Sequence, residues 1–166
     1  MPFTPFHFGP GLLIKSAAPT RFSFLAYAAA QVAIDVEPLV HMARGEWPIH
    51  RAVHTFLVAP LVGLAAGALT CALVFRRPRP LEAAPALRGE SGWASVVAGG
   101  VIGGLLHPFL DGLMHTDIQP FQPFMAGNPL LGRVSLAALY LGCVASGLLG
   151  IGLLARPRLW RRTTSL

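Results

Sequence analysis

The stretch that decides the fold is Ala94–His115, which reads ASVVAGGVIGGLLHPFLDGLMH. About 20 of its residues could cross a hydrocarbon core about 30 Å thick as a helix. His107, Asp111 and His115 follow one another at four-residue spacing, so a helix would place them on one face. Each ionisable side chain inside a membrane costs about 2.5 kcal/mol or more, and such residues usually have a function. The stretch therefore predicts a membrane helix with a site near one end.

Three further runs are long and apolar enough to be membrane helices. They are Phe22–His41, Arg51–Phe75 and Leu130–Ala155. The chain of 166 residues is 54% hydrophobic and only 12% charged, whereas soluble domains are about 25% charged. We therefore expect an all-α, polytopic membrane bundle of four transmembrane helices, folded as a single integral membrane domain over residues 1–166.

The basic residues predict the orientation of the bundle. If the four helices alternate, ten of the 13 Lys and Arg residues fall on one side of the membrane, leaving Arg44, Arg51 and Arg133 on the other. The ten are Lys15, Arg21, Arg76, Arg77, Arg79, Arg88, Arg156, Arg158, Arg161 and Arg162. This bias is typical of bacterial inner-membrane proteins and places the loop 76–92 and the C-terminus in the cytoplasm. The net charge of +6 thus reflects topology, and we expect no nucleic-acid partner.

The N-terminal segment 7–16 is apolar but too short to span a membrane. A half-length helix that enters from mid-membrane and turns at the cytoplasmic face would fit it. At 1.5 Å of rise per residue, His7 would lie about 15 Å above the inner face, and Asp35 and His107 about 20 Å above it. A frayed N-terminus at the interface, with His7 in solvent, is the alternative.

Histidines and acids on several of these segments predict a metal site. His50 and His54 are four residues apart, as are His107 and Asp111, and on helices each pair would share a face. Imidazole and carboxylate groups from facing helices are the ligands that zinc prefers. The predicted ligands are His7, Asp35, His54, His107 and Asp111. They would hold one or two divalent ions, with zinc the first choice and manganese or magnesium as alternatives. The alternative is that these histidines and acids bind no metal and are interfacial side chains that extend towards water.

Asp35 and Glu37 cannot both face one site on a regular helix, because two positions correspond to about 200° of rotation. Pro38 disfavours helical geometry at Glu37, so a distorted turn could present both carboxylates. Otherwise Asp35 is the ligand, and Glu37 is a supporting group, a general base or the exposed end of the helix. We assign the general base to Glu37 or His50.

The predicted depths of the candidate ligands in the membrane agree only in part. If Arg51–Phe75 is one helix, His54 lies about 33 Å from the inner face, well above His107. The loop 115–128 (HTDIQPFQPFMAGN) is expected to cover the site or to form an aromatic belt at the headgroups. The candidate substrate-binding residues are His115 and Asp117 in this loop and Arg133 near the outer end of the last predicted helix. Arg133 either binds an anionic headgroup or merely extends to water.

Four short motifs resemble those of the YdjM-like family of bacterial inner-membrane proteins, which are described as membrane-bound metal-dependent hydrolases. They are Thr4-Pro5-Phe6-His7, Asp35-Val36-Glu37, His50 with His54-Thr55, and His107 with Asp111. The resemblance implies a multi-span protein with a His/Asp metal site and hydrolytic activity. That family's site is similar to those of zinc-dependent phospholipase C, which implies phosphoester substrates. The family commonly has Asp-x-Asp-His where this chain has Asp35-Val36-Glu37-Pro38.

The leading functional hypothesis is therefore a metal-dependent hydrolase of the cytoplasmic (inner) membrane. Its site would lie near the outer face, its neighbours would be membrane lipids, and its substrate a phospholipid or another amphiphilic phosphoester. One alternative is a membrane protein that binds or transports a metal without catalysis. Another is a haem-binding bundle with His54 and His107 as axial ligands, which the nearby carboxylates argue against.

Overall fold

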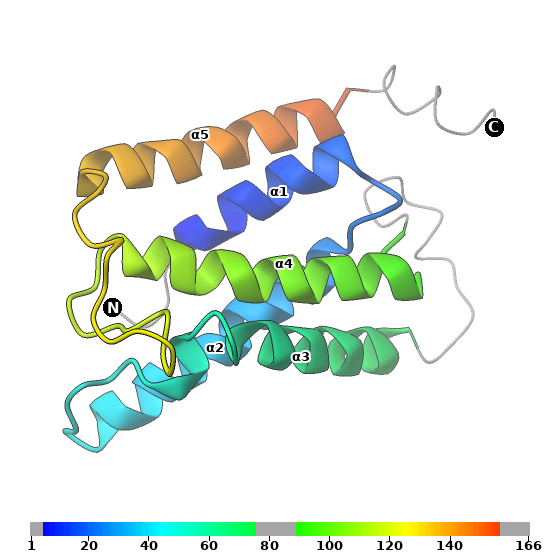
Figure 1. Ribbon diagram of the computed structural model, residues 1–166. Helices are drawn as coiled ribbons and strands as arrows, with labels where there is room; N and C mark the ends of the chain where they lie inside the picture. Colours follow the sequence, from blue (N-terminus) through cyan, green and yellow to red (C-terminus); the bar gives the residue numbers. More distant parts are fainter. Residues whose placement is uncertain (1–4, 76–88, 157–166) are drawn as a thin grey trace.

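The computed structural model describes residues 5–75 and 89–156, and their regular structure is entirely helical (Figure 1). The elements are η1 (Pro5–His7), α1 (Phe8–Ala17), α2 (Phe24–Ala43), η2 (Ala52–His54), α3 (Ala59–Val74), α4 (Trp93–Gly112) and α5 (Leu136–Leu154). The all-α prediction is confirmed for these residues. Most of the predicted cytoplasmic loop and the basic tail, residues 76–88 and 157–166, lie outside the described residues.

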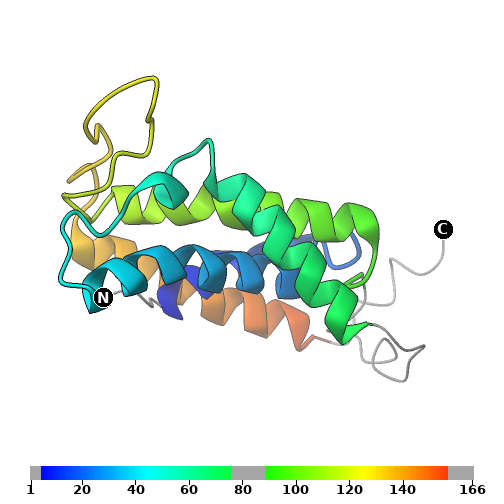
Figure 2. The same cartoon turned by 90° about the horizontal axis from the view of Figure 1, so that it is seen from below.

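The helices form two packed groups. Helices α2, α3 and α4 all contact one another, while α5 packs on the short helix α1, which also contacts α2. Figure 1 shows α1 running alongside α5, with α4 between this pair and α3 in that view, and Figure 2 shows α3 crossing α2 at an angle. The predicted half-length N-terminal helix is therefore present as α1, and it begins directly after His7.

Glycines allow α3 and α4 to approach at backbone distance. A Cβ atom at Gly100 would collide with the carbonyl oxygen of Gly63, and one at Gly104 would collide with Ala59 and Pro60. Small residues at such positions permit close helix packing in membranes. This close approach brings the segment just before α3 against the last turns of α4.

Within residues 5–75 and 89–156, two helices, α4 and α5, are long and apolar enough to cross a membrane. Helix α3 is apolar but has only 16 residues, and α2 carries Asp35 and Glu37 in its second half. The length and composition of the helices thus support two of the four predicted spans.

The second predicted helix begins later than the sequence pattern indicated. The pattern placed it at Arg51, but α3 starts at Ala59, with Pro60 in its first turn, where proline is favoured. The backbone amides of Arg51 and Val53 instead donate to the Glu37 carboxylate. The prediction that His50 and His54 share a helix face is therefore wrong, because both precede α3 and only His54 lies in a helical turn, that of η2.

The later start of α3 removes the assumption behind the predicted mismatch in depth, which was one continuous helix from Arg51. The 16 residues of α3 rise about 24 Å, rather than the 33 Å expected for His54 on a continuous helix. Residues 51–58 then lie against the loop that follows α4, where the amide of Phe56 donates to the carbonyl oxygen of Pro120 at 2.8 Å.

The other predicted helix boundaries shift for local reasons. Helix α2 begins at Phe24 because the Ser23 side chain caps it, and α5 begins at Leu136, not Leu130, because Ser135 caps it in the same way. Helix α4 ends at Gly112, so His115 lies one turn beyond the helix that was predicted to contain it.

Candidate metal centre

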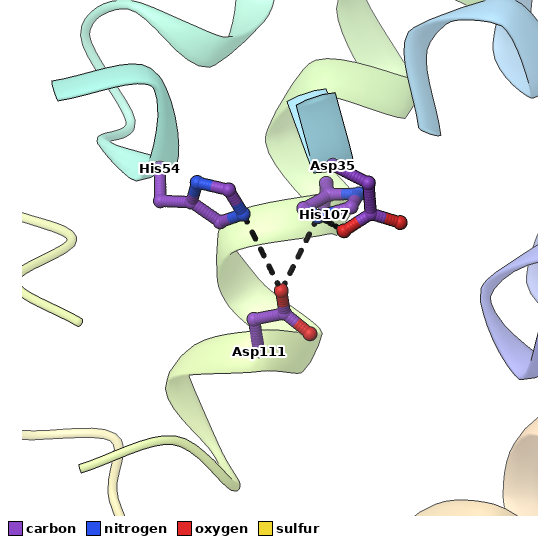
Figure 3. Close-up of side chains that lie close together, drawn as sticks. All are labelled: Asp35, His54, His107 and Asp111. Atoms are coloured by element: carbon purple, nitrogen blue, oxygen red, sulfur yellow. Dashed lines mark ion pairs between the residues drawn. The ribbon is translucent and has the colours of Figure 1, made fainter. Parts of the chain in front are cut away.

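Four ionisable side chains from three elements meet near the end of α4. They are Asp35 on α2, His54 on η2, and His107 and Asp111 on α4, here called the quartet (Figure 3). Each offers one ligand atom, and these atoms all lie within 4.8 Å of one another. All four residues are buried, with His54 and His107 completely shielded from solvent. The sequence analysis predicted all four as metal ligands, and the structure brings them together.

The two histidines point their Nε2 atoms at carboxylates. His107 Nε2 lies 3.2 Å from Asp111 Oδ2 and 3.4 Å from Asp35 Oδ1, and His54 Nε2 lies 3.6 Å from Asp111 Oδ2. Charge-assisted hydrogen bonds between such groups are shorter, about 2.7–2.9 Å. Two ligands each about 2.0–2.1 Å from a tetrahedral zinc ion lie about 3.4 Å apart. These three separations are close to the edge length of a zinc coordination tetrahedron, and all four ligand atoms lie within 4.8 Å of one another.

A hydrogen-bond chain fixes which nitrogen of His107 carries a proton. The side-chain Nε2 of Gln31 donates to the carbonyl oxygen of Gly103 at 3.0 Å, so its Oε1 faces His107 Nδ1 at 2.8 Å. Because that amide oxygen can only accept, Nδ1 of His107 must donate. In the neutral ring, the lone pair of Nε2 then faces the quartet.

Glu37 orients His54 in the same way. Its Oε2 accepts from Nδ1 of His54 at 3.1 Å, and its carboxylate also accepts the amides of Arg51 and Val53. Helix α2 continues through Pro38, so Glu37 does not turn towards the quartet beside Asp35. Of the arrangements left open by the sequence, the structure thus has Asp35 in the quartet and Glu37 behind His54.

These contacts leave buried acceptors facing one another. Nε2 of His54, Nε2 of His107 and Oδ1 of Asp111 are buried without a hydrogen-bond partner among the described residues. Each unsatisfied buried polar group costs about 1–3 kcal/mol. A divalent cation between the nitrogens and the carboxylates would offset this cost, and histidines supported through Nδ1 by a carboxylate or an amide oxygen are characteristic of metal sites.

The remaining predicted ligand, His7, lies beside the quartet. Its Nε2 is 3.3 Å from Oδ1 of Asp111, the oxygen directed away from His54 and His107, and its ring contacts that of His107 edge to face. Both ring nitrogens are buried without a hydrogen-bond partner among the described residues. The N-terminal helix thus delivers His7 to the site and not to solvent.

A second group of three ligand atoms, from His50, Asp111 and His115, also lies within 4.8 Å. Nδ1 of His50 lies 2.9 Å from Oδ1 of Asp117, whose Oδ2 accepts the amides of Ile49 and His50. Burial lowers the pKa of His50, and the neighbouring His54 lowers it further. Burial acts to raise the pKa of Asp117, but the hydrogen bonds from His50 outweigh it, so this pKa lies below its usual value.

Arg133 lies outside both groups. Its side chain is exposed, and its Nε donates to the carbonyl oxygen of Pro129 at 3.1 Å. In the predicted covering loop, Phe121 packs against Phe56, and the two rings border an apolar cavity of about 190 Å³. The structure therefore places the loop over the segment that carries His54, and Arg133 at the surface beyond it.

The sequence analysis missed Gln31. Gln31 precedes Asp35 by four residues in an otherwise apolar run, which is the spacing that puts two side chains on one helix face. This spacing could have identified Gln31 as a residue that faces the site.

No family model matches the chain, and neither the curated proteins nor the solved structures yield a match.

Proposed function

We propose that this protein is a membrane-bound metal-dependent hydrolase that acts on phosphoesters, with the quartet as its zinc site. The observation that carries the proposal is the convergence of two imidazoles and two carboxylates, whose ligand atoms all lie within 4.8 Å of one another. The resemblance of the His and Asp motifs to YdjM-like hydrolases suggests the reaction class and a phospholipid or similar amphiphilic substrate. Manganese or magnesium could replace zinc, although the imidazole ligands favour zinc.

The proposal places the protein in the inner membrane with four helices across it and its C-terminus in the cytoplasm. Support comes from the apolar helices α4 and α5 and from the ten-to-three distribution of basic residues. Helix α5 exposes large apolar side chains such as Leu141 and Leu148, which lipid would cover. The quartet would then lie towards the outer face.

Some residues of this chain would bind the cation directly, and others would orient the residues that bind it. Asp35, His54, His107 and Asp111 would bind it, while Glu37 and Gln31 fix the two imidazole rings. A divalent ion there would lower the pKa of water and polarise a phosphoryl oxygen.

The candidate residues for proton transfer and substrate binding differ in how many hydrogen bonds they already make within the protein. Glu37 accepts three hydrogen bonds, which leaves His50 the better placed of the two candidate bases. Asp117 accepts three hydrogen bonds around His50, so in this proposal it orients that ring. His115 and the exposed Arg133 remain the proposed contacts for an anionic substrate.

Deep burial of the quartet favours a second candidate function, metal binding without catalysis. His54 and His107 are fully shielded and Asp111 is 2% exposed, so a substrate would need the covering loop to move. Haem is disfavoured, because Asp111 Oδ2 lies between the two histidines that would be its axial ligands.

The test is to measure zinc content and hydrolysis of a phosphodiester or phospholipid by the purified protein and its His54→Ala and Asp111→Ala variants. His41→Ala is the matched control, because His41 pairs with Glu46 at the end of α2, away from the quartet. We expect zinc and activity in the wild type and in the control, and loss of both in the two quartet variants. Zinc retained in both variants would overturn the site, and zinc without hydrolysis in the wild type would favour the second candidate.

A further inference from the structure

The quartet uses only one side of the Asp111 carboxylate. Oδ2 faces Nε2 of His107 and of His54, at 3.2 and 3.6 Å. Oδ1 points to another set of nitrogens, with Nε2 of His7 at 3.3 Å and Nε2 of His115 at 3.9 Å. This oxygen is buried and accepts no hydrogen bond from the described residues. A buried carboxylate oxygen requires a partner, and the residues around it are histidines.

His50 is held in the manner of a metal ligand. Its Nδ1 donates to Asp117, because a carboxylate can only accept, and Nε2 is left to bind a cation. Carboxylate-supported imidazoles of this kind are characteristic of metal sites. The ring of His50 lies 4.4 Å from that of His115 and 4.7 Å from that of His54, between centroids. His50 therefore lies beside the quartet without belonging to it.

We infer that His50, His115 and Asp111 bind a second divalent cation, with the Asp111 carboxylate bridging it to the cation in the quartet. The inference rests on the proposed function, since it makes the site dinuclear. Two histidines and one carboxylate are three ligands, the number that leaves a zinc ion with an open position. Paired metal ions about 3.5–4 Å apart occur in many phosphatases and nucleases, where both ions contact the reacting phosphate.

The second site is the more accessible of the two. The His115 side chain is 23% exposed, whereas those of His54 and His107 are completely buried. A phosphate group entering from the surface would therefore meet the second cation first. In a dinuclear site His50 is a ligand, so it no longer serves as the general base.

The test is zinc stoichiometry, measured by mass spectrometry of the purified full-length protein in detergent after saturation with zinc and desalting. We expect two equivalents in the wild type and in His41→Ala, and one in His50→Ala and in His115→Ala. Asp35→Asn should reduce occupancy of the quartet alone, whereas Asp111→Asn should reduce occupancy of both sites because its carboxylate is shared. Circular dichroism melting of each variant identifies any that has failed to fold.

The outcomes separate this inference from the proposed function. One equivalent in the wild type, unchanged in His115→Ala, overturns the second site and leaves the quartet intact. Two equivalents with loss of only one in Asp111→Asn overturns the bridging carboxylate. No bound zinc in the wild type overturns the metal centre as a whole. As a second measurement, Asp117→Asn, which keeps the size of the side chain, should weaken only the second zinc, by about 10–100-fold.

Discussion

Two buried polar clusters occupy opposite ends of the bundle, and they are satisfied in different ways. Away from the quartet, Lys15 at the end of α1 forms an ion pair of 2.6 Å with Glu90, and Lys15 Nζ also donates to the carbonyl oxygen of Phe22. Glu90 accepts three further hydrogen bonds, which come from the Ser23 hydroxyl and from the first two amides of α2. Each oxygen of this carboxylate therefore has two donors.

The quartet has the opposite character. Its carboxylates face imidazole nitrogens at distances longer than charge-assisted hydrogen bonds, and three of its buried atoms have no hydrogen-bond partner among the described residues. The Lys15–Glu90 pair joins the start of α2 to the end of α1 and to the segment before α4, using only protein groups. We infer that one end of the bundle is closed for stability, while the other is arranged for a group that the chain does not supply.

The largest expected effect is on stability, from Glu90→Ala. The substitution leaves the Lys15 ammonium buried without its carboxylate and removes the acceptor for the first amides of α2. Removing one partner of a buried ion pair costs about 3–5 kcal/mol. Thermal or denaturant unfolding in detergent should show this loss, with zinc stoichiometry unchanged in the fraction that remains folded.

A double variant sharpens this prediction. Lys15→Met combined with Glu90→Gln removes both charges together, so it should destabilise the protein less than Glu90→Ala does. If Glu90→Ala abolished zinc binding in folded protein, the separation of the two ends into a structural and a binding cluster would be wrong.

Metal removal should have the next largest effect, and it should act through the two groups that share Asp111. Zinc at about 100 times its dissociation constant stabilises the folded state by about 2.7 kcal/mol. We therefore expect chelation to lower the unfolding temperature of the wild type and of Glu90→Ala alike. In Asp111→Asn the unfolding temperature should not respond to zinc, and a response equal to that of the wild type would show that the ion binds elsewhere.

Gln31→Ala should have a smaller effect, confined to metal affinity. It removes the acceptor that orients His107 Nδ1, and loss of such a supporting contact typically reduces metal affinity about 10–100-fold. Zinc titration against a competing chelator measures the change. Ser146→Ala is a suitable control, because Ser146 likewise contacts a helix carbonyl oxygen but lies on the exposed side of α5. Equal affinities in Gln31→Ala and the wild type would contradict the orienting role.

Local spacing predicted those parts of the site that lie on one helix. His107 and Asp111 are four residues apart within α4, so helical periodicity placed them on one face and the structure does the same. His54 was also predicted to be a ligand and lies in the quartet, although it was expected on a helix and lies in η2. Its position depends on Glu37, which binds the amides of Arg51 and Val53 and so holds this segment out of helical geometry.

Contacts between distant segments could not be predicted from spacing. Glu90 bonds residues that lie 65–67 positions earlier in the chain, and nothing in the sequence around it indicates that its carboxylate is buried. The sharing of Asp111 between two groups likewise depends on how α4, η2 and the segment containing His50 pack. The polar residues of the site were thus evident from the sequence, but the partners that fix their orientation required the fold.

The smallest effect is expected for Arg133, which lies at the surface near the end of the bundle that carries the quartet. Its side chain is exposed and bonds only a backbone carbonyl oxygen among the described contacts, so Arg133→Ala should change the free energy of unfolding by less than about 0.5 kcal/mol. Zinc stoichiometry should also stay the same.

If Arg133 binds an anionic substrate as proposed, Arg133→Ala should raise KM for a phospholipid while kcat changes little. Arg133→Lys should restore part of the loss because it keeps the charge. A loss of bound zinc in Arg133→Ala would instead mean that the loop before α5 helps to hold the metal centre, and that the binding end extends further than the two groups around Asp111.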